Sequence, residues 1–569
     1  MMSKRTGRFK IIEQFLADGM NHMFGNPGTV EQGFLDAIGH YPACKYVLTL
    51  QESVAVMIAD GYARSTQRPA LVQLHSSPGI GNAVGALYQA KRGHSPLVVI
   101  GGDAGTQYLN MDAQMAADLV AMMEPVTKYA TTVYDSRSLL RTIRRAVKIA
   151  CTPPMGPVYV CLPMDVLDEV NEEAVHPTLV PSTRTVPDHA TIDSIAHLLL
   201  ASQKPMIFAG DGVAYSGATA ELARLAELLG AEVYGVDVGD FIMDHTHPLY
   251  QGTTGHMFGE QSMPVTSQGD VNLIVGTYMM PEVFPLLGSI FAPGAKVVHI
   301  DLNAYEIAKN HPIDIGVVAD PKLTLAAVSD VLQESMSAGQ KNAAGQRAEE
   351  IGGRKTAKQA AAIEADKAHA GGHPLMMCQF MQALAARLPR DAIIFDEALT
   401  NSPAIARYFP PKAPGSSFVT RGGSLGVGIP GAIGVKTANP DRTVVGFTGD
   451  GGSMYTIQAL WTAARHGTGA KFVVCNNGCY GLLQANISRY WKERQVAAHD
   501  YPLSFDLSRP VLRFDLLAQA MGVQAVRVER ADDIEPAIEK MLSDDKPFLI
   551  DLVLGGDVRP ELIGVKCGQ

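Results

Sequence analysis

Short apolar runs alternate with helical stretches along the whole chain, and this alternation limits the possible folds more than any other feature. The segments 46–50 (YVLTL), 70–74 (ALVQL) and 96–102 (PLVVIGG) have the length and composition of buried strands. Between them, segments 52–65 (ESVAVMIADGYARS) and 82–93 (NAVGALYQAKRG) have the apolar spacing of helices. Strands buried on both faces and separated by helices predict a parallel sheet with helices on both sides.

The pattern occurs three times, which predicts an α/β protein with three doubly wound parallel-sheet domains of similar size. At 569 residues the chain is also too long for a single hydrophobic core. We expect an N-terminal domain over residues 1–175, a middle domain over 188–334 and a C-terminal domain over 373–569. A polar, proline-bearing linker follows the first domain, and residues 335–372, rich in Ala, Lys, Glu and Gln, predict a solvated and partly helical linker.

Composition and charge argue against several classes of function. The net charge is −10, whereas a general nucleic-acid binder needs a basic surface. No run of about 18 apolar residues occurs, and the N-terminal segment has the pattern of an amphipathic helix, so we expect neither a membrane span nor a signal peptide. The seven cysteines lack zinc-ligand spacing, which predicts reduced thiols in a cytoplasmic enzyme.

The strongest chemical signal lies in the third domain, at the ends of two neighbouring strand-like runs. Gly449-Asp450-Gly451 follows RTVVGFT, and Asn476-Asn477 follows AKFVVC. The carboxyl ends of parallel strands meet in one crevice, so a carboxylate, an amide oxygen and a turn carbonyl would converge there. Such oxygen ligands suit Mg²⁺, and glycines let backbone amides approach phosphates. Two unrelated turns would give the same letters, and the second GDG, at 210–212, lacks a matching NN and is predicted to be a structural turn.

This pairing of GDG with NN resembles the cofactor-anchoring motif of thiamine-diphosphate enzymes. The resemblance covers nearly the whole chain and implies a first domain that binds the pyrimidine and a third domain that binds the diphosphate. It also implies that Asp450, Asn477 and the main-chain carbonyl of Cys479 hold Mg²⁺ against the diphosphate. Residues beside these ligands would line the same pocket, namely Gly449, Gly451, Gly452, Ser453, Tyr480, Gly481 and Leu482.

Glu52 stands where a strand-like run meets a helical one. Taken alone, it is a favourable charge for the first turn of a helix. The resemblance implies a second role, because the family has a glutamate in this setting that hydrogen-bonds the pyrimidine ring of the cofactor. That contact promotes loss of the proton from the thiazolium carbon and so generates the nucleophile.

The segment that begins at Arg421, RGGSLGVGIPGAIG, predicts a glycine-rich turn that leads into a helix. By resemblance, the carbonyl of Gly423 accepts a hydrogen bond from the cofactor and Leu425 props the cofactor in a bent form. Without the motif, Leu425 would be interpreted as an ordinary core leucine. The segment FDEALTNS resembles one that contacts the diphosphate, so Leu399 (through its backbone) and Thr400 are further candidates.

Within the family, the chain is most similar to benzoylformate decarboxylase. By resemblance, Thr29 takes the place of a serine that contacts the substrate carboxylate, and His75 that of a histidine that handles protons. His75 could instead be a capping or core histidine, and His94 is interpreted as structural.

The chain also departs from that enzyme. A second active-site histidine is missing from GTYMMPEVFPLL, where Phe284 falls at about its place, and Asp103 stands where the family usually has Gln. The C-terminal region 479–510 is longer than in that enzyme. The segment 297–322 resembles acetolactate synthase instead.

These comparisons predict a thiamine-diphosphate- and Mg²⁺-dependent enzyme that acts on a 2-oxo acid. It would decarboxylate this acid to an aldehyde, or join it to an aldehyde or second oxo acid as a 2-hydroxy ketone. The alternatives are an acetolactate synthase-like carboligase, a flavin-dependent 2-oxo acid oxidase with FAD in the middle domain, and a non-catalytic paralogue. No G-x-G-x-x-G follows a strand in that domain. The resemblance further implies at least a homodimer, and a homotetramer is expected.

Overall fold

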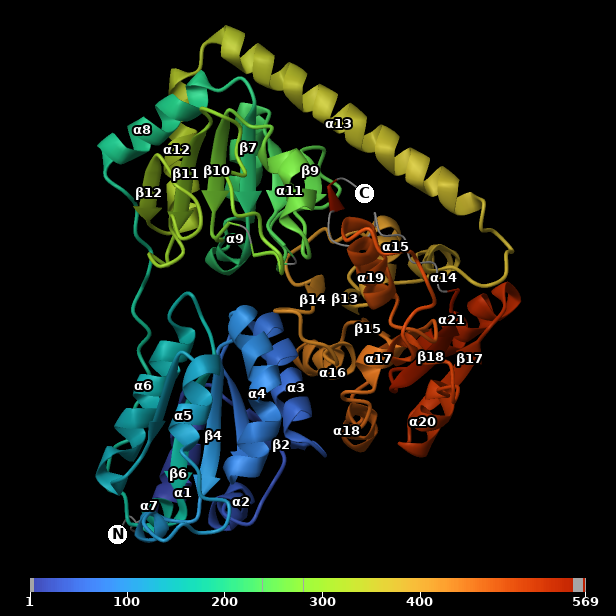
Figure 1. Ribbon diagram of the computed structural model, residues 1–569. Coiled ribbons are helices and arrows are strands. Elements are labelled where there is room, and N and C mark those ends of the chain that lie inside the picture. Colours follow the sequence, from blue (N-terminus) through green and yellow to red (C-terminus); the bar gives the residue numbers. More distant parts are fainter. Residues whose placement is uncertain (1–4, 238, 280, 556–565, 568–569) are drawn as a thin grey trace.

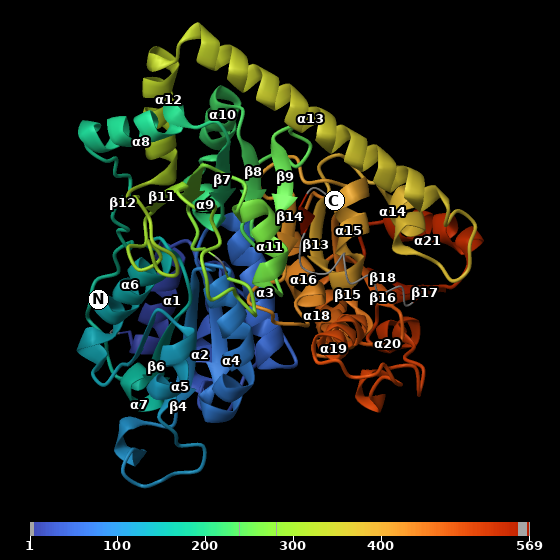
Figure 2. The same cartoon turned by 45° about the horizontal axis from the view of Figure 1, so that its top comes forward.

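The computed structural model describes residues 5–237, 239–279, 281–555 and 566–567. Three α/β domains follow one another along the chain, each built on a mainly parallel sheet (Figure 1). The middle domain lies above the first domain, and the third lies beside both (Figures 1 and 2). The predicted fold class is therefore confirmed.

The first domain contains a six-stranded parallel sheet in the order β2-β1-β3-β4-β6-β5. Its strands are β1 (His22–Gly25), β2 (Lys45–Leu48), β3 (Ala70–His75), β4 (Leu97–Asp103), β5 (Tyr129–Thr132) and β6 (Val158–Pro163). Its α-helices are α1 (Gly7–Ala17), α2 (Gln32–Ile38), α3 (Glu52–Thr66), α4 (Ser76–Arg92), α5 (Leu119–Met123), α6 (Leu139–Cys151) and α7 (Met164–Asp168). The strand order reverses between β1 and β3, so a crevice is expected at their carboxyl ends.

The middle domain has six parallel strands in the order β12-β11-β10-β7-β8-β9, with the short antiparallel strand β19 at the edge. The strands are β7 (Pro205–Ala209), β8 (Glu232–Gly235), β9 (Tyr250–Thr253), β10 (Val271–Val275), β11 (Lys296–Asp301), β12 (Ile315–Val318) and β19 (Lys566–Cys567). The helices are α8 (His189–Ala201), α9 (Asp211–Ser216), α10 (Thr219–Leu229), α11 (Gly259–Thr266) and α12 (Pro321–Ser335). Here the order reverses between β7 and β10.

The third domain repeats the architecture in the order β14-β13-β15-β16-β18-β17, and its order reverses between β13 and β15. Its strands are β13 (Ile393–Glu397), β14 (Ser417–Val419), β15 (Val444–Gly449), β16 (Lys471–Asn476), β17 (Gln524–Val528) and β18 (Phe548–Val553). Its helices are α14 (Met377–Ala385), α15 (Ser402–Tyr408), α16 (Gly428–Ala438), α17 (Asp450–Ser453), α18 (Ala459–His466), α19 (Gly481–Glu493), α20 (Phe514–Ala520) and α21 (Ile534–Leu542).

One long helix, α13 (Ala338–Lys367), connects the middle domain to the third and runs along the outside of both (Figure 1). The segment predicted as a partly helical linker is thus helical over most of its length. Ser337 caps the helix through a capping box with Gln340, and few residues of α13 are buried. None of the helices in the described ranges is both long and apolar enough to span a membrane.

Helices α3 and α16 join the first domain to the third, because small residues let their backbones touch. A side chain at Gly61 would collide with the carbonyl of Gly431, and one at Gly434 would collide with the carbonyl of Ile58. Buried residues of both domains consequently form one hydrophobic cluster around this contact. The two domains that hold predicted site residues are therefore fixed to each other within a single chain.

Candidate active site

The GDG and NN turns of the third domain lie side by side, as the parallel register of β15 and β16 requires. Gly449 at the end of β15 is level with Cys475 near the end of β16. The carboxylate of Asp450 links the turns, since its Oδ2 accepts a hydrogen bond from the backbone N–H of Gly478 at 2.7 Å. Its Oδ1 accepts from the N–H of Gly451, also at 2.7 Å. The two halves of the sequence motif thus form one site.

The donor set of this site fits a hard cation bound to a diphosphate. Asp450 supplies a carboxylate, Asn477 an amide oxygen and Cys479 a main-chain carbonyl, which are the ligand types that Mg²⁺ prefers. In the described part of the chain no three His, Cys, Asp or Glu side chains gather as a metal site. A cation here would therefore need further oxygens from a bound phosphate group. Open space lies beside Gly449 and Gly423, where a side chain would meet nothing within 4 Å.

Electrostatics at Asp450 also favour a bound cation. The residue is 4% exposed. Burial raises the pKa of this carboxyl, while the N–H groups of Gly451 and Gly478 lower it. A positive ion at the site would offset the cost of keeping the carboxylate charged and buried.

The glycine-rich turn before α16 holds the residues predicted to shape the cofactor. Gly422, Gly423 and Gly426 have φ values of 59°, 72° and 89°, a region that favours glycine. Gly423 is exposed and Leu425 is half-buried. Leu425 is therefore not a fully buried core leucine in a single chain.

The predicted diphosphate contacts lie just after β13, the strand next to β15. Leu399 has a φ of 50° and begins a short 3₁₀ turn that includes Thr400. Gly452 and Ser453 are buried in α17, Gly481 begins α19 with Leu482 behind it, and Tyr480 packs against Gly451. All the residues predicted for the diphosphate side therefore come from the carboxyl ends of β13, β15 and β16 or from the turn before α16.

Glu397, at the end of β13, was not predicted as a site residue. Its Oε2 accepts hydrogen bonds from the N–H of Gly428 at 2.5 Å and from the Thr448 hydroxyl at 3.2 Å, and its Oε1 accepts from the N–H of Gly426. The carboxylate therefore fixes the end of the glycine-rich turn to the central strands of the sheet. Because Glu397 is only 1% exposed, burial raises its pKa to about 7.

This pKa gives a pH-dependent prediction for the cofactor-free protein. The folded value lies above the ordinary 4.5, so the contribution of Glu397 to stability is complete below about pH 4.5 and is lost as the pH rises through 7. The loss should be at most about 3.5 kcal/mol, because the pKa changes from 4.5 to about 7 and each pKa unit corresponds to about 1.4 kcal/mol. Urea unfolding should give a lower free energy of unfolding at pH 8 than at pH 5 in the wild type, and a smaller difference between the two pH values in Glu397→Gln. The same difference in both proteins would contradict the prediction.

In the first domain, Glu52 is the first residue of α3 and is almost completely buried, with 6% exposed. The Asn26 amide donates to its Oε1 at 2.9 Å, and the Asn82 amide donates to its Oε2 at 3.0 Å. Asn26 follows β1 and Asn82 lies in α4, so three segments hold one carboxylate. The predicted strand-to-helix position of Glu52 is confirmed, and the two asparagines were not predicted.

His75 ends β3 and lies in the same crevice, at the switch point of the first sheet. Its Nδ1 is 3.0 Å from Oε2 of Glu31, whose Oε1 accepts from the N–H of Gly102 at 3.1 Å. Burial raises the pKa of Glu31, while His75 lowers it. The ring also packs against the backbone of Gly28 so closely that a side chain there would overlap it. This arrangement fixes the imidazole and leaves Nε2 as its remaining polar atom.

Thr29 lies in the exposed turn directly after Gly28, two residues before Glu31, the partner of His75. Asp103 ends β4, where its side chain accepts from the N–H of Ala104. Phe284, which takes the place of a family histidine, is 57% exposed and stacks on Phe258 with 5.2 Å between ring centroids. No polar group of Phe284 can replace the missing proton donor.

We expect His75→Ala to lower turnover far more than cofactor affinity, because the residue lies on the substrate side of the predicted site. The loss in kcat should be roughly 10²- to 10⁴-fold, as for a proton-transfer group. Steady-state kinetics, thiamine diphosphate titration and thermal unfolding would be compared with those of His40→Ala, an exposed histidine of the same domain. Loss of cofactor or of the fold would instead support a structural role for His75.

Comparison with known proteins agrees with this geometry. Residues 5–122 match the N-terminal TPP binding domain of thiamine pyrophosphate enzymes, residues 192–328 the central domain, and residues 400–552 the C-terminal TPP binding domain. Together the three matches cover most of the chain, in the order in which the structure shows its three domains.

Individual relatives match over nearly their full length. Benzoylformate decarboxylase of Pseudomonas aeruginosa is 29% identical over 94% of this chain and 96% of its own. A probable acetolactate synthase large subunit of Methanocaldococcus jannaschii is 29% identical over 96% of this chain and 92% of its own. Among solved structures, the thiamine diphosphate-dependent 4-hydroxybenzoylformate decarboxylase of Rhodococcus jostii RHA1 has a TM-score of 0.83 and 26% identity, covering 97% of this chain and all of its own. The predicted family is therefore confirmed, and the chain belongs to the thiamine pyrophosphate enzymes, with all three of their domains.

Proposed function

We propose that this chain uses thiamine diphosphate and Mg²⁺ to cleave the bond between the carboxyl and carbonyl carbons of a 2-oxo acid. The products are carbon dioxide and either an aldehyde or, with an aldehyde or second oxo acid as acceptor, a 2-hydroxy ketone. One observation carries the proposal, namely that Glu52 and Asp450 are both buried and both held by specific hydrogen bonds. Relatives that are decarboxylases or acetolactate synthases support the same reaction class.

The residues have distinct roles in this proposal. Bound thiamine diphosphate supplies a carbon nucleophile and accepts the electrons of the breaking bond. Asp450, Asn477 and the carbonyl of Cys479 hold Mg²⁺, and Glu52 holds a proton at the pyrimidine. On the substrate side, the hydroxyl of Thr29 contacts the carboxylate of the 2-oxo acid.

His75 moves a proton through Nε2 once the carboxylate has left. Its contact with Glu31 supports this role, because a carboxylate that accepts from Nδ1–H fixes the tautomer and the orientation of the ring. The exposed Phe284 leaves His75 as the histidine proposed for this step.

The test is carbon dioxide release over a panel of 2-oxo acids with aromatic, branched and small side chains, each with and without an aldehyde acceptor. Aldehyde formation without an acceptor would favour decarboxylation, and 2-hydroxy ketone formation would favour carboligation. A protein loaded with thiamine diphosphate and Mg²⁺ that releases no carbon dioxide from any acid would contradict the proposal.

We also propose that the active unit is at least a homodimer, with two such dimers forming a homotetramer, and that the enzyme is cytoplasmic. Exposed apolar side chains beside both halves of the site support an interface, namely Leu50 near Glu52 and Met454, Tyr455 and Leu483 near Asp450. Six cysteines, namely Cys44, Cys151, Cys161, Cys378, Cys475 and Cys479, are free thiols, which supports a reducing compartment.

A complementation experiment tests whether the site is shared between subunits. Glu52→Gln and Asp450→Ala chains, each inactive alone, would be mixed under conditions that allow subunit exchange. In a shared site, a mixed dimer has one site with both lesions and one with neither, so activity should partly return. Absence of activity in demonstrated mixed dimers would mean that each chain builds its own site.

The flavin-dependent alternative has less support. A cavity of about 690 Å³ does lie at the carboxyl ends of β7, β10 and β11. However, the sequence after β7 reads GDGVAYSG, with Tyr215 at the place where a G-x-G-x-x-G phosphate-binding turn has its third glycine. A purified protein with a yellow flavin spectrum would reverse this preference.

A further inference from the structure

Arg421, the first residue of the glycine-rich segment, lies where all three domains meet. Its guanidinium leaves the third domain and donates to both carboxylate oxygens of Asp211 in the middle domain, with Nη1 2.9 Å from Oδ1. It also donates to the main-chain carbonyl of Arg92 in the first domain, at 3.2 Å. The side chains of Arg421 and Asp211 are 11% and 8% exposed.

Asp211 belongs to the second GDG of the sequence, which has no metal-binding partner turn. Its Oδ1 also accepts a hydrogen bond from the N–H of Asp240 at 2.8 Å, and its Oδ2 lies 3.8 Å from Nε2 of His94. Burial alone would raise the pKa of Asp211, but Arg421 holds that pKa well below its usual range. The pair therefore stays charged and bidentate, a geometry that fixes direction as well as distance.

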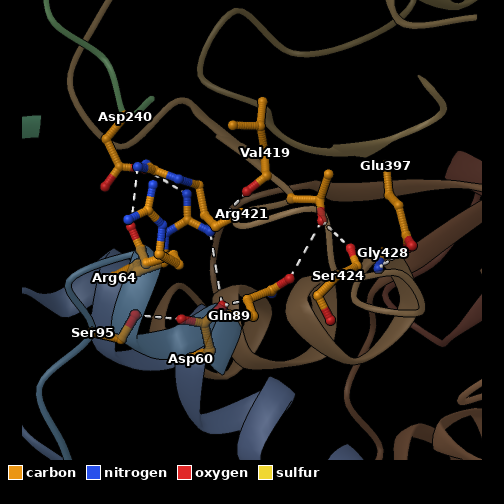
Figure 3. Close-up of polar contacts among 12 residues, drawn as sticks. Asp60, Arg64, Gln89, Ser95, Asp240, Glu397, Val419, Arg421, Ser424 and Gly428 are labelled. Carbon is orange, nitrogen blue, oxygen red and sulfur yellow. Dashed lines mark hydrogen bonds and ion pairs between the residues drawn. The ribbon is translucent and has the colours of Figure 1, made fainter. Parts of the chain in front are cut away.

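A second set of contacts holds the strand and residue just before Arg421 (Figure 3). Arg64 of α3 donates to the carbonyl of Val419 at 2.9 Å and to the carboxylate of Asp240 at 2.5 Å. The hydroxyl of Thr420 lies 3.3 Å from the amide oxygen of Gln89 and donates to the carbonyl of Ser424 at 2.5 Å. Residues of the first and middle domains thus hold the start of the turn from two sides.

The glycine-rich turn cannot fix its own conformation. Three of its glycines have positive φ, and glycine loses more conformational freedom on ordering than any other residue. Glu397 fixes the end of the turn through Gly426 and Gly428. Arg421 fixes the start of the turn. Residues 422–425 therefore lie between two fixed points, Arg421 and Gly426.

We propose that Asp211 is a positioning residue that acts through Arg421 to set the geometry of Gly423 and Leu425. This inference rests on the proposed function, in which the turn shapes the bound cofactor. It assigns the middle domain a part in cofactor binding, although Asp211 lies on a different domain from the turn. It also gives the second GDG a role, because its aspartate is the ion-pair partner of Arg421.

The first test measures the turn without cofactor. Amide hydrogen exchange of a peptide spanning residues 420–428 would be followed by mass spectrometry in the wild type and in Asp211→Asn. Loss of a charge-assisted hydrogen-bond pair should speed exchange there by roughly tenfold or more. Asp366→Asn is the matched control, because it breaks the Arg407–Asp366 pair between α13 and α15, whose side chains are each 14% exposed. This control should lower thermal stability without opening the turn.

The second test measures cofactor affinity. The Kd for thiamine diphosphate in excess Mg²⁺ should rise by about tenfold in Asp211→Asn, stay near the wild-type value in Asp366→Asn, and recover partly in Asp211→Glu, which restores the charge. With saturating cofactor, KM for a 2-oxo acid should not change. Unchanged exchange and affinity in Asp211→Asn, or changes that follow thermal stability equally in both variants, would overturn the proposal.

The two proposals can fail separately. A wild-type protein that binds thiamine diphosphate but acts on no 2-oxo acid would contradict the proposed function. The amide exchange of residues 420–428 would still report whether Asp211 holds the turn, because that measurement needs neither cofactor nor substrate.

Discussion

Asp450→Ala is expected to abolish activity, and excess thiamine diphosphate is not expected to restore it. The residue supplies the one carboxylate of the proposed Mg²⁺ site, and its Oδ2 also connects the two turns through Gly478. Mg²⁺ at this site holds the diphosphate of the cofactor, so loss of its carboxylate ligand should prevent productive cofactor binding and remove the activity. Steady-state rates over a range of Mg²⁺ and cofactor concentrations would show whether any condition rescues the variant.

Two further variants separate metal binding from folding. Asp450→Asn keeps one oxygen, which can accept from the N–H of either Gly478 or Gly451, but removes the charge, so it should fold with a modest loss of thermal stability and still be inactive. Asp441→Ala changes an exposed aspartate of the same domain and should be fully active. Calorimetry should also show that Mg²⁺ binds weakly without thiamine diphosphate and tightly with it, because the diphosphate completes the oxygen ligands. A fully active Asp450→Ala enzyme would show that this site is assigned wrongly.

The strands that could be predicted from sequence are those with long apolar runs. The segments that form β3, β4, β15 and β16 are five or more residues long and are buried on both faces. In contrast, β1 (HMFG) and β14 (SFV) are short, and β1 begins with a histidine. Strand β1 nevertheless lies between β2 and β3, because neighbouring strands supply its hydrogen bonds. Such strands depend on tertiary context that no local pattern records.

The same distinction applies to the site. The turns at Asp450 and Asn477 are local patterns at two strand ends, so their chemistry could be inferred before the fold was known. The partners that orient the site come from distant segments: Glu31 and His75 are 44 residues apart, and Arg421 and Asp211 are 210 apart. The Glu31–His75 pair forms only when the first domain folds, and the Arg421–Asp211 pair only when the middle and third domains are assembled. A charged residue in a turn, such as Asp211, gives no sign of its partner in the sequence alone.

Glu52→Gln should leave the protein folded while lowering activity by roughly 10²- to 10⁴-fold, the usual range for a proton-transfer group. Glutamine has nearly the same shape, and its amide oxygen can still accept from either Asn26 or Asn82. The other asparagine would then face an amide N–H₂ group, which costs about 1–3 kcal/mol for a buried unsatisfied donor. Thermal unfolding should therefore shift modestly, whereas catalysis should collapse.

The decisive measurement for Glu52 is hydrogen–deuterium exchange at the thiazolium carbon of the bound cofactor, followed by rapid quenching and NMR. It reports proton removal directly and needs no substrate, so it does not depend on which 2-oxo acid the enzyme uses. Asn82→Ala serves as the control, since it loosens one contact to the carboxylate but keeps the carboxylate itself. Exchange should be slowed most in Glu52→Gln and less in Asn82→Ala. If Glu52→Gln exchanges as fast as the wild type while still binding the cofactor, another group activates the cofactor, and the burial of Glu52 has a purely structural cause.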